Sequence, residues 1–207
     1  MKKHHLLLIV VLTMSPVVAQ NFYVETGILS SNFTYENSVG AEIGNYQPAT
    51  SSYLAVGYKD RFFIKRVQWG LGFARTGYGA VGNGDVMDYL AWDLKYLEVE
   101  FHLNVELFYI RDFTVYGKGG FSSGFMLSGT QTINTAVYDL KEIDQFSNGI
   151  ANFKFGLGLS YPIIKEMSLY LEYVYGSSLN VEKNTDETLN IRSNRIGLGL
   201  SVNLFSK

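Results

Sequence analysis

The sequence predicts an all-β fold, an eight-stranded antiparallel up-and-down transmembrane β-barrel, from three observations. Eight segments alternate large apolar residues with small or polar ones, the period-two pattern of a strand with one apolar face. The connections between these segments are alternately long and short. The first twenty residues have the features of an export signal.

The eight segments define the expected strands and the connections between them. The connections after the second, fourth and sixth segments are the short stretches "KDRF", "FYIRD" and "PIIKE", whereas the others are longer and polar. Outer-membrane barrels combine short periplasmic turns with longer extracellular loops, and an even strand number returns both termini to the periplasm. We expect strands at about 21–35, 51–58, 63–76, 91–107, 113–128, 149–161, 167–179 and 190–205.

The N-terminal segment "MKKHHLLLIVVLTMSPVVAQ" begins with Lys2 and Lys3 and continues with an apolar run. That run is about nine residues long, which suits a signal peptide, whereas a bilayer-spanning helix needs about 20 residues. Val17 and Ala19 occupy the −3 and −1 positions of a cleavage site before Gln20. We therefore expect a signal peptide at 1–19, a barrel domain at 20–207 and export to the bacterial outer membrane.

The composition excludes several classes of protein. The chain has 207 residues, a net charge of −2 and no cysteine, so we expect no nucleic-acid partner, disulfide or metal–thiolate site. Its mean hydropathy is only +0.05. A low mean value is compatible with a transmembrane barrel, because half of each barrel strand is polar.

The position of the charged residues indicates which face of the strands meets lipid. In "RIGLGLSVNLF", at 195–205, large apolar residues alternate with glycine, serine and asparagine. Five charged residues share the register of the apolar face, and each lies at the end of its expected strand, where the cost of a charge falls from about 2–4 kcal/mol towards zero. A soluble ligand-binding barrel would instead need the large residues inside. The five are Lys65, Arg75, Asp93, Lys95 and Arg192.

The opposite face is predicted to line a filled lumen held together by ion pairs. A barrel of about eight strands is just wide enough for side chains to fill it, and an unpaired buried ion costs several kcal/mol. Glycines at 70, 72, 156, 158, 197 and 199 leave room for larger inward groups. The expected lumen charge network comprises Glu25, Arg66, Glu98, Glu100, His102, Lys118, Lys154, Glu172 and Arg195.

Two surface features suggest partners. Arg75, Lys95 and Arg192 would meet the outer-leaflet headgroups and lipopolysaccharide, where arginine can contact phosphate. The long loops carry about ten acidic residues against two lysines, which could hold divalent cations beside lipopolysaccharide phosphates or repel anionic ligands, or could simply be solvated.

Neither of two further motifs supports chemistry. The stretch "GYGAVG", with Gly77, Gly79 and Gly82, matches a dinucleotide-binding pattern, but we expect it in an extracellular loop without the helix that such a site requires. His102 is the only histidine after the signal peptide; its expected mid-lumen depth and the lack of other ligands argue against catalysis and metal binding. We therefore expect no catalytic, cofactor or metal site and no enzymatic activity.

Several stretches resemble the outer-membrane β-barrel domain family of Gram-negative bacteria, which includes porin-family, PorT-like and OmpA/OmpX-type proteins. They are "ETGILSSNFTY", "YLEVEFHLNV", "FKFGLGLSYPI", "LYLEYVYGSSLNV" and "RIGLGLSVNLF". The resemblance implies an eight-stranded barrel inserted by the barrel insertion machinery, and it carries no catalytic motif. Many such barrels end on an aromatic residue, whereas here Leu204 holds the last outward position.

The function predicted from the sequence is a structural or interaction scaffold presenting acidic extracellular loops. The alternatives are a porin-like channel for small solutes or ions, and a component of a secretion or envelope-assembly machine with an unidentified envelope partner. The last alternative rests on family analogy alone.

Overall fold

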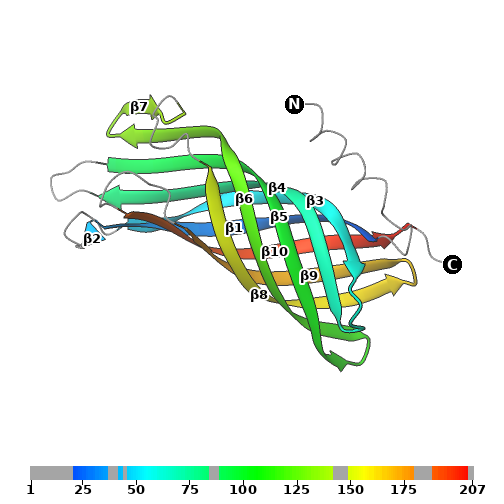
Figure 1. The fold of residues 1–207 in the computed structure, drawn as a ribbon. Helices are drawn as coiled ribbons and strands as arrows, with labels where there is room; N and C mark the ends of the chain where they lie inside the picture. Colours follow the sequence, from blue (N-terminus) through cyan, green and yellow to red (C-terminus); the bar gives the residue numbers. More distant parts are fainter. Residues whose placement is uncertain are drawn as a thin grey trace, which may run out of the picture.

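Eight long antiparallel strands form one closed barrel in the computed structural model, which describes residues 21–36, 42–43, 46–83, 89–141, 149–179 and 188–204 (Figure 1). The barrel closes because β10 pairs with β1 along its whole length, from Asn21↔Asn203 to Glu36↔Thr188. Two short strands, β2 (Glu42–Ile43) and β7 (Ala136–Asp139), pair with β1 and β6. The barrel strands are β1 (Asn21–Glu36), β3 (Tyr46–Arg61), β4 (Val67–Asn83), β5 (Tyr89–Ile110), β6 (Phe113–Ile133), β8 (Ile150–Ile164), β9 (Met167–Ser178) and β10 (Thr188–Asn203).

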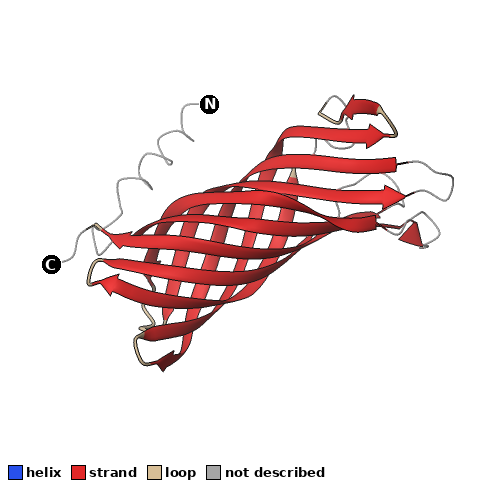
Figure 2. Ribbon diagram, turned by 180° about the vertical axis from the view of Figure 1, so that it is seen from behind, coloured by secondary structure: helices blue, strands red, loops and turns tan. Residues whose placement is uncertain are grey.

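The predicted fold class and all eight predicted strands are confirmed. The short connections are residues 62–66, 111–112 and 165–166, all at one end of the barrel, as Figure 2 shows from behind. The predicted signal peptide at 1–19 lies outside the described residues, so the domain boundary stays a prediction. Among the described residues, no helix is long and apolar enough to cross a bilayer.

The strands run further at the loop end than the sequence predicts. On one side of the barrel β4, β5 and β6 extend well beyond the point where β8 begins, and they form the projecting sheet in Figure 1. Gly77, Gly79 and Gly82 lie within β4, paired with β5, so their assignment to an extracellular loop is wrong. Glycine is depleted in strands, so the local sequence does not indicate that this segment is a strand. Backbone pairing with β5 nevertheless keeps it extended.

The outward face of the barrel is apolar around the whole circumference. Side chains such as Phe155, Leu157 and Ile196 are about 60% exposed (61%, 59% and 61%) on β8 and β10. A continuous apolar belt of this kind exceeds what soluble monomers expose, so lipid is the solvent that it fits. This arrangement excludes the soluble barrel with large residues inside.

The interior has a layered composition that can be read along one strand. From the loop end towards the turn end, the inward residues of β5 are Leu94, Tyr96, Glu98, Glu100, His102 and Asn104, all at most 5% exposed. An apolar cluster therefore fills the loop-end part of the lumen, and a charged layer lies beneath it. The cluster comprises Leu29, Phe33, Tyr78, Ala80, Leu94, Tyr96, Met126, Leu140, Ile150 and Ile191.

Candidate functional site in the lumen and at the outer rim

Seven charged side chains from six strands meet in the middle of the lumen. Strand alternation directs each of them inward, and all are at most 8% exposed. They are Glu25 on β1, Glu98 and Glu100 on β5, Lys118 on β6, Lys154 on β8, Glu172 on β9 and Arg195 on β10.

The two lysines divide the carboxylates into two groups. Lys154 Nζ lies 2.8 Å from Glu98 Oε2 and also donates to Glu100 Oε1. Lys118 Nζ lies 2.5 Å from Glu172 Oε2 and 3.9 Å from Glu25 Oε2. Each lysine thus offsets part of the repulsion between two carboxylates, which is strong in a medium of low dielectric constant.

Arg195 joins the two groups into one network. Its Nη2 atom lies 3.2 Å from Glu25 Oε1 and 3.5 Å from Glu172 Oε2, and its Nη1 atom lies 3.8 Å from Glu100 Oε1. The guanidinium also lies over the ring of Tyr53, 3.8 Å from its centroid, a cation–π geometry. One side chain therefore contacts carboxylates of the two neighbouring strands, β1 and β9, and of β5 across the lumen.

Each lumen carboxylate also accepts a hydrogen bond from a tyrosine hydroxyl. Ionised carboxylates form stronger hydrogen bonds than neutral acceptors, so these four bonds help to replace the lost hydration. The pairs are Tyr53 to Glu100, Tyr78 to Glu98 and Tyr116 to Glu172, each at 2.7 Å, and Tyr170 to Glu25 at 3.5 Å.

Glycines on neighbouring strands provide the space for these side chains. A Cβ atom added to Gly158 would overlap the ring of Tyr116, and one added to Gly199 would overlap that of Tyr170. The same holds for Gly70, Gly72 and Gly197, which face His102, Tyr23 and Glu25 respectively. At the sixth predicted position, Gly156, the nearest atom belongs to the backbone of β9 instead.

His102 lies at the turn-end side of this network. It is 4% exposed, and its ring packs edge-on against Tyr23 with centroids 5.7 Å apart. Its Nδ1 atom has no hydrogen-bond partner among the described residues. Within the same residues, no three His, Cys, Asp or Glu side chains are grouped so that they could hold a metal ion.

Arg66 does not belong to the network, which corrects the sequence prediction. The third predicted strand begins at Val67 instead of 63, so Arg66 lies exposed in the turn between β3 and β4. The turn is closed by hydrogen bonds between Phe62 and Val67 and between Val67 and Ile64. The carbonyl of Arg66 still accepts a hydrogen bond from the amide of Glu106 on β5, but the side chain of Arg66 is exposed at the turn end of the barrel. Arg66 extends the period-two pattern of β4 by one step, so the local sequence alone cannot exclude it.

The lumen network predicted from the sequence contains neither the fourth interior cation, Lys59, nor the four tyrosines that donate to its carboxylates. Lys59 lies over the ring of Tyr170 at 4.3 Å from the centroid. It shares the odd-numbered inward register of Tyr53 and Ala55 on β3 and lies one residue beyond the predicted end of that strand at 58, so extending the alternation by one residue finds it. Tyr78 has no such signal, because it lies beyond the predicted end of its strand.

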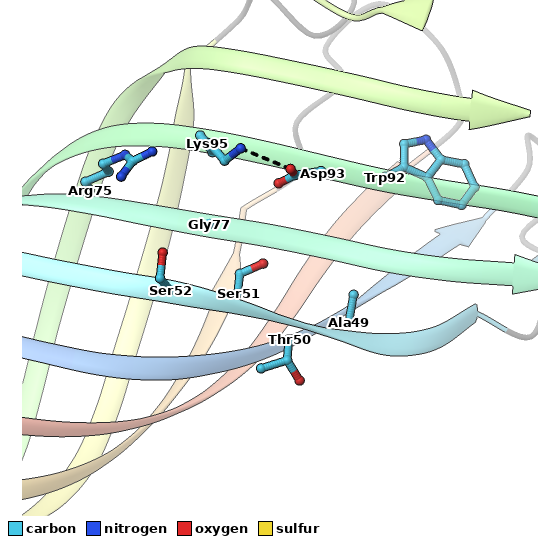
Figure 3. Close-up of a pocket in the computed structure, with 9 residues that line it drawn as sticks. All are labelled: Ala49, Thr50, Ser51, Ser52, Arg75, Gly77, Trp92, Asp93 and Lys95. Atoms are coloured by element: carbon cyan, nitrogen blue, oxygen red, sulfur yellow. Dashed lines mark hydrogen bonds and ion pairs between the residues drawn. The ribbon is translucent and has the colours of Figure 1, made fainter. Parts of the chain in front are cut away.

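The three predicted rim residues are all on the outer wall, but the structure brings only two of them together. Arg75 on β4 and Lys95 on β5 line one hollow, shown in Figure 3, together with residues of β3. Arg192 is exposed on β10, and β3 and β1 lie between β4 and β10 in the sheet.

Comparison with solved structures identifies the fold. Neisserial surface protein A is similar with a TM-score of 0.50 and 13% identity, over 88% of this chain and 97% of that one. The outer membrane protease OmpT from Escherichia coli has a TM-score of 0.51 and 8% identity, over 93% and 99% of the two chains. No protein-family model and no curated protein matches the sequence.

The chain is thus a transmembrane β-barrel with the fold of outer-membrane proteins of the OmpA/OmpX type. Its lumen is occupied by an ion-pair network and an apolar cluster. Protease activity is a property of OmpT, and at 8% identity the likeness carries the fold alone.

Proposed function

We propose that this protein is an integral outer-membrane scaffold whose lumen is closed and whose role is carried by the structures that it presents at the cell surface. The observation that supports this proposal is the apolar cluster across the loop-end part of the lumen. Leu94 and Leu140 in this cluster are 0% exposed. An ion would have to cross this layer without water, which costs far more than thermal energy.

Leu140 supports the proposal further, because it comes from the segment that follows β7. The hairpin of β6 and β7 turns back, and the amide of Leu140 donates to the carbonyl of Gly129 at 2.9 Å. The extracellular region itself therefore contributes a side chain to the lumen. Beneath it, Glu98 and Lys154 are in direct contact, so these two charges of the charged layer are paired with each other.

The channel alternative predicts a different electrical behaviour. We expect the refolded protein to be electrically silent in planar bilayers. We expect the double variant Glu98→Gln/Lys154→Met to be silent as well, because the apolar cluster remains above the altered pair. Single-channel recording checks this, with a boiling-dependent gel shift on the same vesicles showing that the barrel has inserted.

A stable conductance of the wild-type protein, with an ion selectivity that changes in Glu98→Gln alone, would replace the scaffold proposal by the channel alternative. Glu98→Gln removes one negative charge from the lumen wall, so a true aqueous path would become less cation-selective.

The scaffold role also predicts that changing an extracellular segment removes the function without unfolding the barrel. Residues 129–140 contain the end of β6, all of β7 and Leu140, so a change that spares the fold must begin after them. We expect that replacing 142–148 by a Gly/Ser segment of equal length leaves the free energy of unfolding within about 0.5 kcal/mol of wild type. We expect the same variant to fail to restore the envelope phenotype of a gene-deletion strain.

Outer-membrane levels of the variant, measured on boiled and unboiled gels, serve as the control for that experiment. If equal amounts of wild-type and loop-replaced barrel restore the strain equally, this loop is not the functional surface. A variant with 84–88 replaced in the same way then tests the neighbouring loop. If that variant also restores the strain, the presentation role is wrong for both.

A further inference from the structure

A hollow of about 280 Å³ opens on the outer wall of the barrel between β3, β4 and β5 (Figure 3). It forms where the register of β3 shifts: between the pairs Pro48↔Ala80 and Tyr53↔Thr76, the four residues 49–52 of β3 face only the three residues 77–79 of β4. Gly77 allows this close approach, since an added Cβ atom would lie 2.7 Å from Ser51 Cβ. The hollow is therefore a consequence of a β-bulge, a feature that commonly redirects side chains at functional sites.

The charges in the hollow are unequal. Lys95 Nζ pairs with Asp93 Oδ2 at 3.1 Å, whereas Arg75 has no acidic partner among the described residues. Two cations and one anion leave the hollow with an excess of one positive charge. Ser51 and Ser52 add hydroxyl groups on the side of β3 towards Arg75 and Lys95, as Figure 3 shows.

The apolar residues next to the hollow show at which level of the membrane it lies. On β4, Arg75 follows the lipid-facing Phe73, which is 59% exposed. On β3, Ser52 precedes the lipid-facing Leu54, which is 50% exposed. The hollow thus begins where the apolar belt ends, on the side of the long loops, which is the outer leaflet in a barrel of this topology.

We propose that this hollow binds the phosphate group of an outer-leaflet lipid. Arg75 is the principal ligand, because a guanidinium presents parallel donors that match two phosphate oxygens. Lys95 is a second cation, and Asp93 competes with the phosphate for it. The proposal concerns the outer wall, so it is independent of whether the lumen is closed.

Arg192 provides the matched comparison. It is also an exposed arginine on the outer wall, but its strand neighbours are Asn32 and Ser177 and it does not line the hollow. A general attraction of the barrel to anionic lipid would involve Arg192 as much as Arg75. Specific binding in the hollow would involve Arg75 but not Arg192.

The test uses the full-length barrel refolded in detergent and titrated with phosphatidic acid, a lipid whose headgroup is a phosphate monoester. Native mass spectrometry measures the bound fraction, and phosphatidylcholine is the neutral reference. We expect Arg75→Gln to weaken phosphatidic acid binding about tenfold, the equivalent of one charge-assisted hydrogen bond. We expect Lys95→Gln to weaken it about threefold, and Arg192→Gln to change it less than about twofold.

The decisive variant is Asp93→Asn, because we expect it to strengthen phosphatidic acid binding whereas the other variants weaken it or leave it unchanged. Removing this carboxylate frees Lys95 and adds one net positive charge, so phosphatidic acid should bind about threefold more tightly. Weaker binding by Asp93→Asn, or equal losses in Arg75→Gln and Arg192→Gln, would overturn the proposal. All four residues are on the outer wall and partly or fully exposed, and a boiling-dependent gel shift verifies that each variant is folded.

Equilibrium dialysis with inorganic phosphate in lipid-free detergent distinguishes the source of the phosphate. We expect millimolar or weaker binding, because the acyl chains that would pack against Phe73 and Leu54 are missing. If inorganic phosphate binds as tightly as phosphatidic acid and with the same dependence on Arg75, the hollow is a site for a soluble anion and the lipid proposal fails.

Discussion

Replacing Arg195 by methionine is expected to lower the free energy of unfolding by about 3–5 kcal/mol, the usual cost of removing one partner from a buried ionic network. Arg195 is 2% exposed and contacts Glu25, Glu100 and Glu172. Methionine keeps much of the volume but removes the charge. The two lysines would then face four buried carboxylates, so the loss falls on the charge balance and not on packing.

Equilibrium unfolding in urea, followed by the gel shift between folded and unfolded barrel, measures this loss. The control is Arg192→Met, three residues away on the same strand but exposed, which we expect to change stability by less than about 0.5 kcal/mol. Adding Glu25→Gln to Arg195→Met removes one of the uncompensated charges and should recover part of the loss. Equal stability of Arg195→Met and Arg192→Met would mean that the lumen network does not hold the strands together.

Replacing Gly158 by valine is the second large effect that we expect, a loss of about 3 kcal/mol. A Cβ atom at this position would overlap the ring of Tyr116, and overpacking alone costs about 1–3 kcal/mol. If the ring moves away, its hydroxyl also loses the 2.7 Å hydrogen bond to Glu172, and bonds to charged groups contribute about 1.5–3 kcal/mol. Intrinsic β-propensity alone would predict a gain in stability instead of a loss, because valine favours strands and glycine does not.

The control for that experiment is Gly119→Val on β6. No atom lies within 4 Å of a Cβ atom added to Gly119, so valine there gains strand propensity without a clash. We expect unchanged or slightly higher stability in the same urea assay. The double variant Gly158→Val/Tyr116→Ser should be more stable than Gly158→Val alone, because the smaller side chain makes room. Destabilisation by Gly119→Val of the same size would show that glycine is needed for backbone reasons and not for space.

The assignment of lipid-facing and lumen-facing residues was accessible from the sequence because alternation is local. Leu198 and Gly199 are neighbours on one strand, yet one is 49% exposed and the other is covered by Tyr170. Seven of the charged residues assigned to the interior form one network, and His102 lies beside it. Arg66 is the exception because the alternation continues into the turn, where its side chain is exposed although its carbonyl still accepts a hydrogen bond from Glu106.

The pairing of the charges could not be derived in the same way. Lys154 on β8 meets Glu98 and Glu100 on β5, although β6 lies between these strands in the sheet. Arg195 on β10 contacts Glu172 on the adjacent β9, but it meets Glu25 on β1 and Glu100 on β5 only because the sheet closes. Such contacts depend on the stagger and radius of the barrel, which are properties of all eight strands together.

Three features can be derived from the amino-acid pattern alone: the fold class, the number and order of the barrel strands, and the face of each strand that meets lipid. These features follow from a short-range period repeated eight times, with turns whose lengths alternate. Other features are visible only in the folded barrel. They are the extent to which β4, β5 and β6 project, the glutamate to which each tyrosine donates, and the hollow that Arg75 and Lys95 share without Arg192. Those outcomes depend on pairing between strands and on one β-bulge in β3, neither of which leaves a periodic trace in the amino-acid sequence.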